Sequence, residues 1–105
     1  MKLIKIIIFL LISFNTSLIA NSNDDLENIL SEGGKLIFIR HAYAPGGGDP
    51  DNFDIANCSS QRNLNREGIE QAKTIAKFFS KENIESSIVL SSEWCRCKQT
   101  AKYAF

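Results

Sequence analysis

The chain has little of what several protein classes require. Its 105 residues leave room for one domain at most, and they contain no internal repeat and no low-complexity tract. Twelve basic residues balance twelve acidic ones, and setting aside Lys2 and Lys5 of the opening segment leaves ten basic against twelve acidic, a net charge of −2. No basic stripe remains, so nucleic acid is not an expected partner.

Histidine and cysteine, the usual ligands of zinc, are also scarce. The sequence has one histidine, His41, and three cysteines, Cys58, Cys95 and Cys97. A Cys-x-Cys pair with one distant cysteine and a single histidine does not have the usual spacing of a zinc site. No metal is therefore expected. A thiol-redox or metal module built on these cysteines is kept as an alternative function, which thiol counting and metal analysis would test.

The longest apolar run is shorter than the ~20 residues that span a bilayer. Met1 to Lys5 is short and cationic, Ile6 to Phe14 is apolar except for Ser13, and small and polar residues follow. This order is typical of a secretory signal peptide, expected over residues 1–22, with cleavage after Ala20 or Ser22. The mature protein, residues 23–105, is then periplasmic or secreted, without a stable membrane span. An uncleaved N-terminal anchor is the alternative.

Export changes the meaning of the cysteines, because an oxidising compartment permits disulfides. Cys95 and Cys97 are too close in sequence to pair comfortably with each other. A bridge from Cys58 to one of these two is therefore expected, with the third thiol left unpaired.

The remaining pattern predicts strands alternating with helices. A short helix is expected over 24–30, capped by Asn23 or Asp24 and ended by Gly33 and Gly34. Apolar runs at 35–40 and 87–90 predict buried strands, and an amphipathic pattern predicts a helix over 65–80 with Asn65 as its N-cap. Residues 41–63 are expected to form a long functional loop, and 94–105 a last helix.

This order predicts an α/β fold, a three-layer parallel-type sheet with helices on both faces. The C-terminal ends of parallel strands meet at one edge, which would bring together Arg40, His41, Ser91 and Arg96. Arginine guanidiniums hold phosphoryl oxygens through charge-assisted hydrogen bonds. A neutral imidazole attacks phosphorus when its other nitrogen keeps the proton, most simply by donating to a backbone carbonyl of the glycine-rich loop.

Three ordered motifs resemble the histidine phosphatase superfamily, which includes the phosphoglycerate mutases. Residues 36–42, Leu-Ile-Phe-Ile-Arg-His-Ala, are similar to its Arg-His-Gly/Ala signature. Residues 64–72 are similar to its Leu-Thr/Ser-x-x-Gly-x-x-Gln-Ala helix start, and residues 89–101 to its Ser-x-x-x-Arg-x-x-Gln-Thr-Ala segment. The resemblance covers roughly residues 35–102.

The resemblance implies a phosphoric monoester hydrolase or phosphotransferase that acts on small phosphorylated substrates. His41 would be the phosphohistidine, Arg40 and Arg96 its phosphate pocket, and Arg62 a third guanidinium. Transfer in this family needs neither a metal nor another cofactor, because the positive pocket stabilises the charge on the equatorial oxygens.

Two departures from the family pattern stand out. The family has a second histidine far downstream, and most branches have a carboxylic acid that protonates the leaving group; this chain has no second histidine, and no motif assigns the acid. We therefore expect an N-terminal portion of the family domain, apparently truncated, which alone neither folds cooperatively nor hydrolyses phosphomonoesters at an enzyme-like rate. The alternative function is a catalytically incomplete phosphate-binding or partner-binding remnant of the same fold.

The signal peptide gives the first prediction. Protein exported through its own leader should begin near residues 21–23, because small residues precede both candidate cleavage positions. Intact-mass measurement of exported protein tests this, with cytoplasmic protein made without export as the control. A mass that retains the first twenty residues would support the uncleaved anchor instead.

Overall fold

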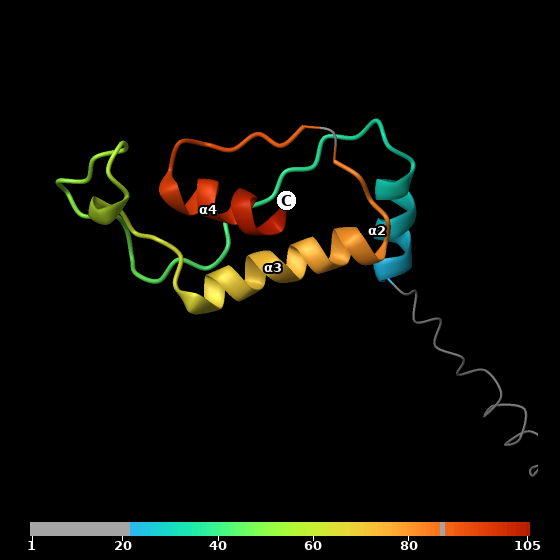
Figure 1. The fold of residues 1–105 in the computed structure, drawn as a ribbon, viewed down its shortest axis with the longest axis horizontal. Coiled ribbons are helices and arrows are strands. Elements are labelled where there is room, and N and C mark those ends of the chain that lie inside the picture. The colour runs from blue at the N-terminus through green and yellow to red at the C-terminus, as the bar shows by residue number, and fades with distance from the viewer. Residues whose placement is uncertain (1–21, 87) are drawn as a thin grey trace, which may run out of the picture.

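The computed structural model of the protein describes residues 22–86 and 88–105, so the predicted signal peptide lies outside the described residues except for Ser22. Within these ranges, four helical elements follow one another (Figure 1): α2 at Ser22–Ser31, the 3-10 turn η1 at Cys58–Ser60, α3 at Arg66–Lys81 and α4 at Cys95–Ala104. No helix in the described ranges is long and apolar enough to cross a membrane.

The three predicted helices are confirmed, together with two of their sequence signals. The side chain of Asn65 accepts a hydrogen bond from the Gly68 amide at 3.0 Å, which caps α3 as the sequence predicts. Gly33 and Gly34, which follow α2, have φ angles of 69° and 66° in the left-handed region that glycine favours. The predicted caps Asn23 and Asp24 are wrong, because α2 already begins at Ser22 and includes both residues.

The main packing contact joins α3 and α4, which lie side by side (Figure 1). The side of α3 predicted to be apolar turns inward, with Ala72 and Phe79 fully or almost fully buried. Phe79 stacks edge-on against Phe105 at the end of the chain, with ring centroids 5.0 Å apart. Burying a phenylalanine contributes roughly 1.5–3 kcal/mol, so this contact helps to hold the two helices together.

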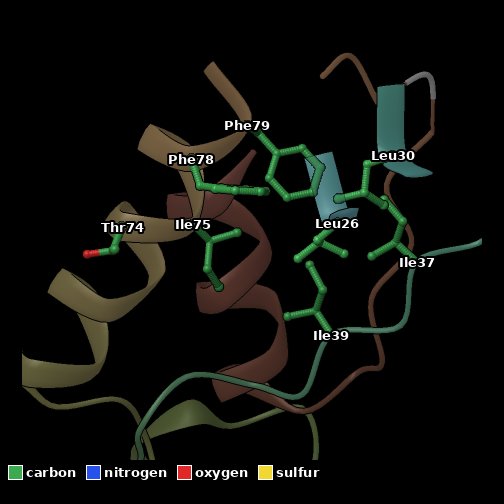
Figure 2. Close-up of a pocket in the computed structure, with 8 residues that line it drawn as sticks. All are labelled: Leu26, Leu30, Ile37, Ile39, Thr74, Ile75, Phe78 and Phe79. Atoms are coloured by element: carbon green, nitrogen blue, oxygen red, sulfur yellow. The ribbon is translucent and has the colours of Figure 1, made fainter. Parts of the chain in front are cut away.

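An apolar pocket of about 350 Å³ lies between α2, α3 and the chain that follows α2 (Figure 2). Ile37 and Ile39 point into it from residues 36–39, across from Leu26 of α2 and Phe78 of α3. Its lining includes no ionisable side chain, so the pocket provides packing between the elements rather than chemistry.

The predicted α/β fold is wrong for the described residues, which form helices and no strand or sheet. Residues 35–40 and 88–90 have no regular secondary structure and pair with no neighbouring strand within the described ranges. An apolar run forms a sheet only where a partner satisfies its backbone groups. Leu36 and Phe38 accordingly stay 87% and 92% exposed, and of this run only Ile37 and Ile39 have an apolar pocket to line. The layered sheet inferred from these runs is absent here.

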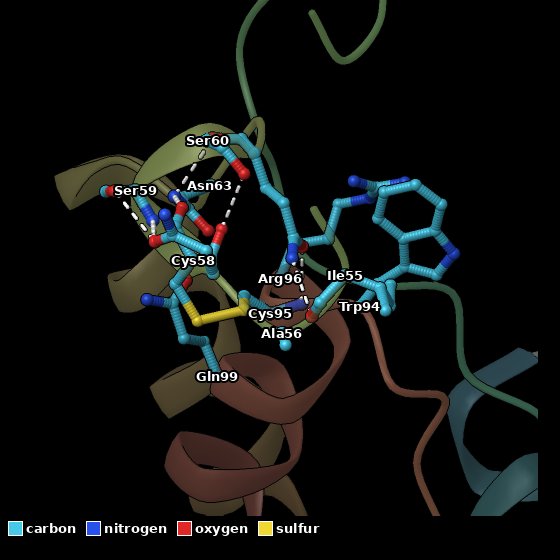
Figure 3. Close-up of a disulfide and its surroundings, with 12 residues drawn as sticks. Ile55, Ala56, Cys58, Ser59, Ser60, Asn63, Trp94, Cys95, Arg96 and Gln99 are labelled. Atoms are coloured by element: carbon cyan, nitrogen blue, oxygen red, sulfur yellow. Dashed lines mark hydrogen bonds between the residues drawn. A yellow bond between two sulfur atoms is a disulfide. The ribbon is translucent and has the colours of Figure 1, made fainter. Parts of the chain in front are cut away.

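The long loop at 41–63 is confirmed, interrupted only by η1, and a disulfide ties it to α4. Cys58 of η1 is bonded to Cys95 of α4 (Figure 3), with the two Cα atoms 5.6 Å apart. Cys97 is a free cysteine. The Cys58–Cys95 bond is one of the two predicted pairings. The buried side chain of Gln61 strengthens the same junction, since it accepts from the Cys95 amide at 3.0 Å and donates to the Asp54 and Ile55 carbonyls.

Removing this disulfide should destabilise the protein. The bond closes a loop of 37 residues, which corresponds to about 4 kcal/mol on the chain-entropy account. The double variant Cys58→Ser/Cys95→Ser should lose that much unfolding free energy in urea titration of oxidised protein, whereas Cys97→Ser, the matched control, should change little. Equal stabilities for the two variants would contradict the bridge.

Candidate active site

His41 lies in an open pocket of about 330 Å³ at the start of the long loop. Three predicted site residues, Arg40, His41 and Arg62, line it, together with Ala42, Tyr43, Ala44, Gly46 and Gln71. Arg40 is exposed and His41 half-buried, so a solute can reach the imidazole. The pocket therefore combines one histidine with two guanidinium-bearing residues.

The imidazole of His41 is held by its own chain. Its Nδ1 lies 2.8 Å from the Ala42 carbonyl oxygen, an acceptor, so Nδ1 carries the proton and donates it. The second ring nitrogen, Nε2, then has a free lone pair in the neutral ring. This is the tautomer that a nucleophilic role requires, and the acceptor is a carbonyl of the loop, as the sequence predicted.

Two helices hold the backbone on either side of this hydrogen bond. The Ala42 amide donates to the hydroxyl of Thr100 in α4 at 2.9 Å, and that hydroxyl donates in turn to the Arg96 carbonyl at 2.7 Å. The Tyr43 amide donates to Oε1 of Gln71 in α3 at 2.8 Å. His41 thus sits on a segment fixed to both α3 and α4 by side-chain acceptors.

The Arg62 side chain hydrogen-bonds to the first residues of the loop. Its Nη1 donates to the Ala44 carbonyl at 2.6 Å and, more weakly, to the Gly46 carbonyl at 3.4 Å. Its backbone amide donates to Oδ1 of Asp49 at 2.8 Å. Arg62 therefore organises the loop around the pocket and carries a positive charge into its lining.

Arg96 lies outside the lining of this pocket, and its main partner is Asp49. Its Nη1 is 3.0 Å from both Asp49 carboxylate oxygens, and the two side chains are only 11% and 12% exposed. The guanidinium also stacks over the Trp94 ring, 4.3 Å from its centroid. Its Nε is buried and has no hydrogen-bond partner within the part of the chain that the structure describes.

The expected convergence of four residues is therefore only partly observed. Arg40 and His41 share the pocket, Arg96 is connected to it through Thr100, and the Ser91 hydroxyl donates to the neighbouring Ser92 carbonyl instead. The prediction relied on two parallel strand ends meeting at one edge. Without that sheet, loop and helix contacts place the residues.

Sequence reasoning missed Asp49, Gln71 and the role of Thr100. Asp49 stood among glycines and prolines as an ordinary loop residue, and only its low exposure beside two arginines marks it. Gln71 and Thr100 belong to two of the family motifs described above, and that membership was the only indication in the sequence that they matter to the site. Among the described residues, no three histidine, cysteine, aspartate or glutamate side chains gather as metal ligands would.

The Asp49 contacts give a prediction of stability. Asp49→Ala should lower the unfolding free energy by about 2 kcal/mol, because it leaves a largely buried guanidinium and the Arg62 amide without their acceptor. Asp49→Asn should cost less, since one oxygen remains. Asp51→Ala, an exposed neighbour, is the control in chemical denaturation. Equal stabilities for Asp49→Ala and Asp51→Ala would refute the structural role of the ion pair.

Comparison with known proteins agrees with the motifs. Residues 36–105, which are 70 of the 105, match the histidine phosphatase superfamily (branch 1). No curated protein and no solved structure matches the chain. The family match covers the His41 pocket, the loop, α3 and α4, and it extends over two thirds of the sequence. The chain therefore belongs to the histidine phosphatase superfamily.

Proposed function

We propose that the protein is an exported phosphatase or phosphotransferase that acts on small phosphomonoesters through a phosphohistidine at His41. One observation carries the proposal: in a member of this superfamily, the Nδ1 proton of His41 is donated to the Ala42 carbonyl, which leaves Nε2 as the reactive atom. The Cys58–Cys95 disulfide is compatible with export and supports that part of the proposal.

The chemistry proceeds in two displacements. Nε2 attacks phosphorus, the N–P bond forms as the bond to the leaving oxygen breaks, and that oxygen takes up a proton from solvent, which the water of the second step returns. Water then attacks the phosphohistidine, which releases inorganic phosphate and restores the neutral imidazole. An acceptor alcohol in place of water makes the same site a phosphotransferase.

The guanidiniums supply the electrostatic part of the mechanism. Arg40 and Arg62 line the pocket and would bind the equatorial oxygens of the transferring group. Arg96 would contribute through Nη2, because Asp49 engages its Nη1. Asp49 would then orient Arg96 while reducing the net positive charge beside the pocket.

Phosphoenzyme formation tests this proposal. The full chain incubated with labelled acetyl phosphate, a labile phosphodonor, should acquire an acid-labile label, and His41→Asn should acquire none while keeping its fold. Arg40→Ala and Arg96→Ala should each slow labelling roughly 10²–10³-fold, the scale expected for one preorganised donor. Vanadate should compete with the donor.

Lys77→Ala, an exposed change on α3 remote from the pocket, is the matched control. Labelling of His41→Asn within tenfold of the unchanged protein would rule out the nucleophile. Reversible phosphate binding without any label would instead favour a binding protein that kept the pocket and lost turnover.

A further inference from the structure

One peptide group connects His41 to α3. The carbonyl of Ala42, which accepts the Nδ1 proton of His41 at 2.8 Å, and the amide of Tyr43, which donates to Oε1 of Gln71 at 2.8 Å, belong to the same peptide plane. A peptide is planar and rigid, so an acceptor that holds its N–H also fixes the direction of its C=O. Gln71 therefore acts on His41 through a single rigid group.

The chain of hydrogen bonds also has an electronic consequence. When an amide donates its proton to an acceptor, its carbonyl becomes a better acceptor, because consecutive hydrogen bonds polarise one another. Gln71 Oε1, the Ala42–Tyr43 peptide and the Nδ1–H of His41 form such a sequence. A stronger acceptor at Ala42 favours the proton on Nδ1 and the lone pair on Nε2.

The approach of α3 to this peptide depends on Gly68. A Cβ atom built at Gly68 would lie 2.0 Å from the Tyr43 carbonyl oxygen, closer than any side chain permits. Gln71 follows three residues later, on the same side of the helix. Glycine thus lets the first turn of α3 contact the backbone at Tyr43, and glutamine uses that contact to accept the Tyr43 amide.

The preceding peptide is fixed from the other side. Thr100 of α4 accepts the Ala42 amide, and Ala42 itself is buried, with 4% of its surface exposed. Since the amide before Ala42 is already held, the orientation of the next peptide is the remaining freedom that decides where the Ala42 carbonyl points. Gln71 holds that peptide.

We propose that Gln71 is a positioning residue that keeps the proton of His41 on Nδ1 and so presents Nε2 to phosphorus. The proposal rests on the proposed function of His41 as nucleophile. Gln71 itself is exposed, so replacing it opens no cavity in the core, and an effect on His41 can be separated from an effect on folding.

The tautomer of His41 can be measured directly, because it is the only histidine in the chain. In protein labelled with ¹⁵N, the two ring nitrogens give one unambiguous pair of NMR signals, recorded in alkaline buffer where their chemical shifts no longer change with pH. The full chain should show mainly the Nδ1–H form. Gln71→Leu should lower the ratio of Nδ1–H to Nε2–H about two- to fivefold, the lower part of the range for one hydrogen bond, because Gln71 acts on the ring through the peptide.

Two further variants make the result specific. Gln71→Glu keeps an oxygen acceptor at the same position and should restore the ratio. Lys77→Leu, another exposed polar-to-apolar change on α3, should leave it unchanged. A ratio in Gln71→Leu equal to that of the unchanged protein, or failure of Gln71→Glu to restore it, would overturn the proposal.

Labelling by acetyl phosphate separates this proposal from the proposed function. If the unchanged protein is labelled, Gln71→Leu should be labelled two- to fivefold more slowly, and equal rates would overturn the positioning role. If the unchanged protein is not labelled at all, the nucleophile proposal fails. The tautomer ratio alone then decides whether Gln71 orients the ring.

Discussion

The hydrogen bond from the Ala42 amide to the Thr100 hydroxyl is the contact on which the site depends most. The loop that follows His41 has few backbone hydrogen bonds of its own, so side chains from the helices must fix where it begins. Thr100 does this from a buried position on α4, one turn after Arg96, whose carbonyl its hydroxyl also contacts. The Thr100 hydroxyl therefore links the segment that carries His41 to α4. The Cys58–Cys95 disulfide and Gln61 in turn hold α4 to the C-terminal part of the loop.

The three arginines near the pocket differ in how far their positive charge is compensated by nearby acceptors. Arg40 is exposed at the pocket, Arg62 donates to loop carbonyls, and Arg96 is largely neutralised by Asp49. The Asp49 carboxylate accepts from the Arg62 backbone amide and from the Arg96 guanidinium, so it satisfies both donors and orients the Arg96 side chain. Under the proposed function it would also oppose a bound phosphate electrostatically, so the loop that carries Asp49 would influence both the order and the anion affinity of the site.

The sequence predicted local structure well and pairing between segments poorly. Helix α3 was recognisable from Asn65 and from the spacing of Ala72 and Phe79, because capping and amphipathic periodicity are local properties. The Cys58 bridge followed from spacing and compartment. The strands did not form, since an apolar run such as 36–39 specifies a buried environment but not the partner that would complete a sheet.

In the candidate site, too, residues close together in the sequence were predicted better than pairs far apart in it. Arg40, His41 and Arg62 meet in one pocket as expected, since two are adjacent in sequence and the third ends the same loop. Asp49 escaped notice because its partner Arg96 is 47 residues away, and no local pattern encodes such a pair. Gln71 and Thr100 were visible as motif letters, but their meaning depends on which backbone atoms they contact.

The two glutamines beside the site illustrate why neutral acceptors suit it. Gln71 accepts the Tyr43 amide at the pocket, and Gln61 accepts the Cys95 amide next to Arg96. A carboxylate would be the stronger acceptor in either place, but it would repel a phosphate dianion and would compete for the nearby guanidiniums. An amide oxygen fixes the same N–H without adding charge. Among the described residues, those that line the pocket include no carboxylate, Asp49 is paired with Arg96, and the exposed guanidinium of Arg40 is the group that would meet an anion under the proposed function.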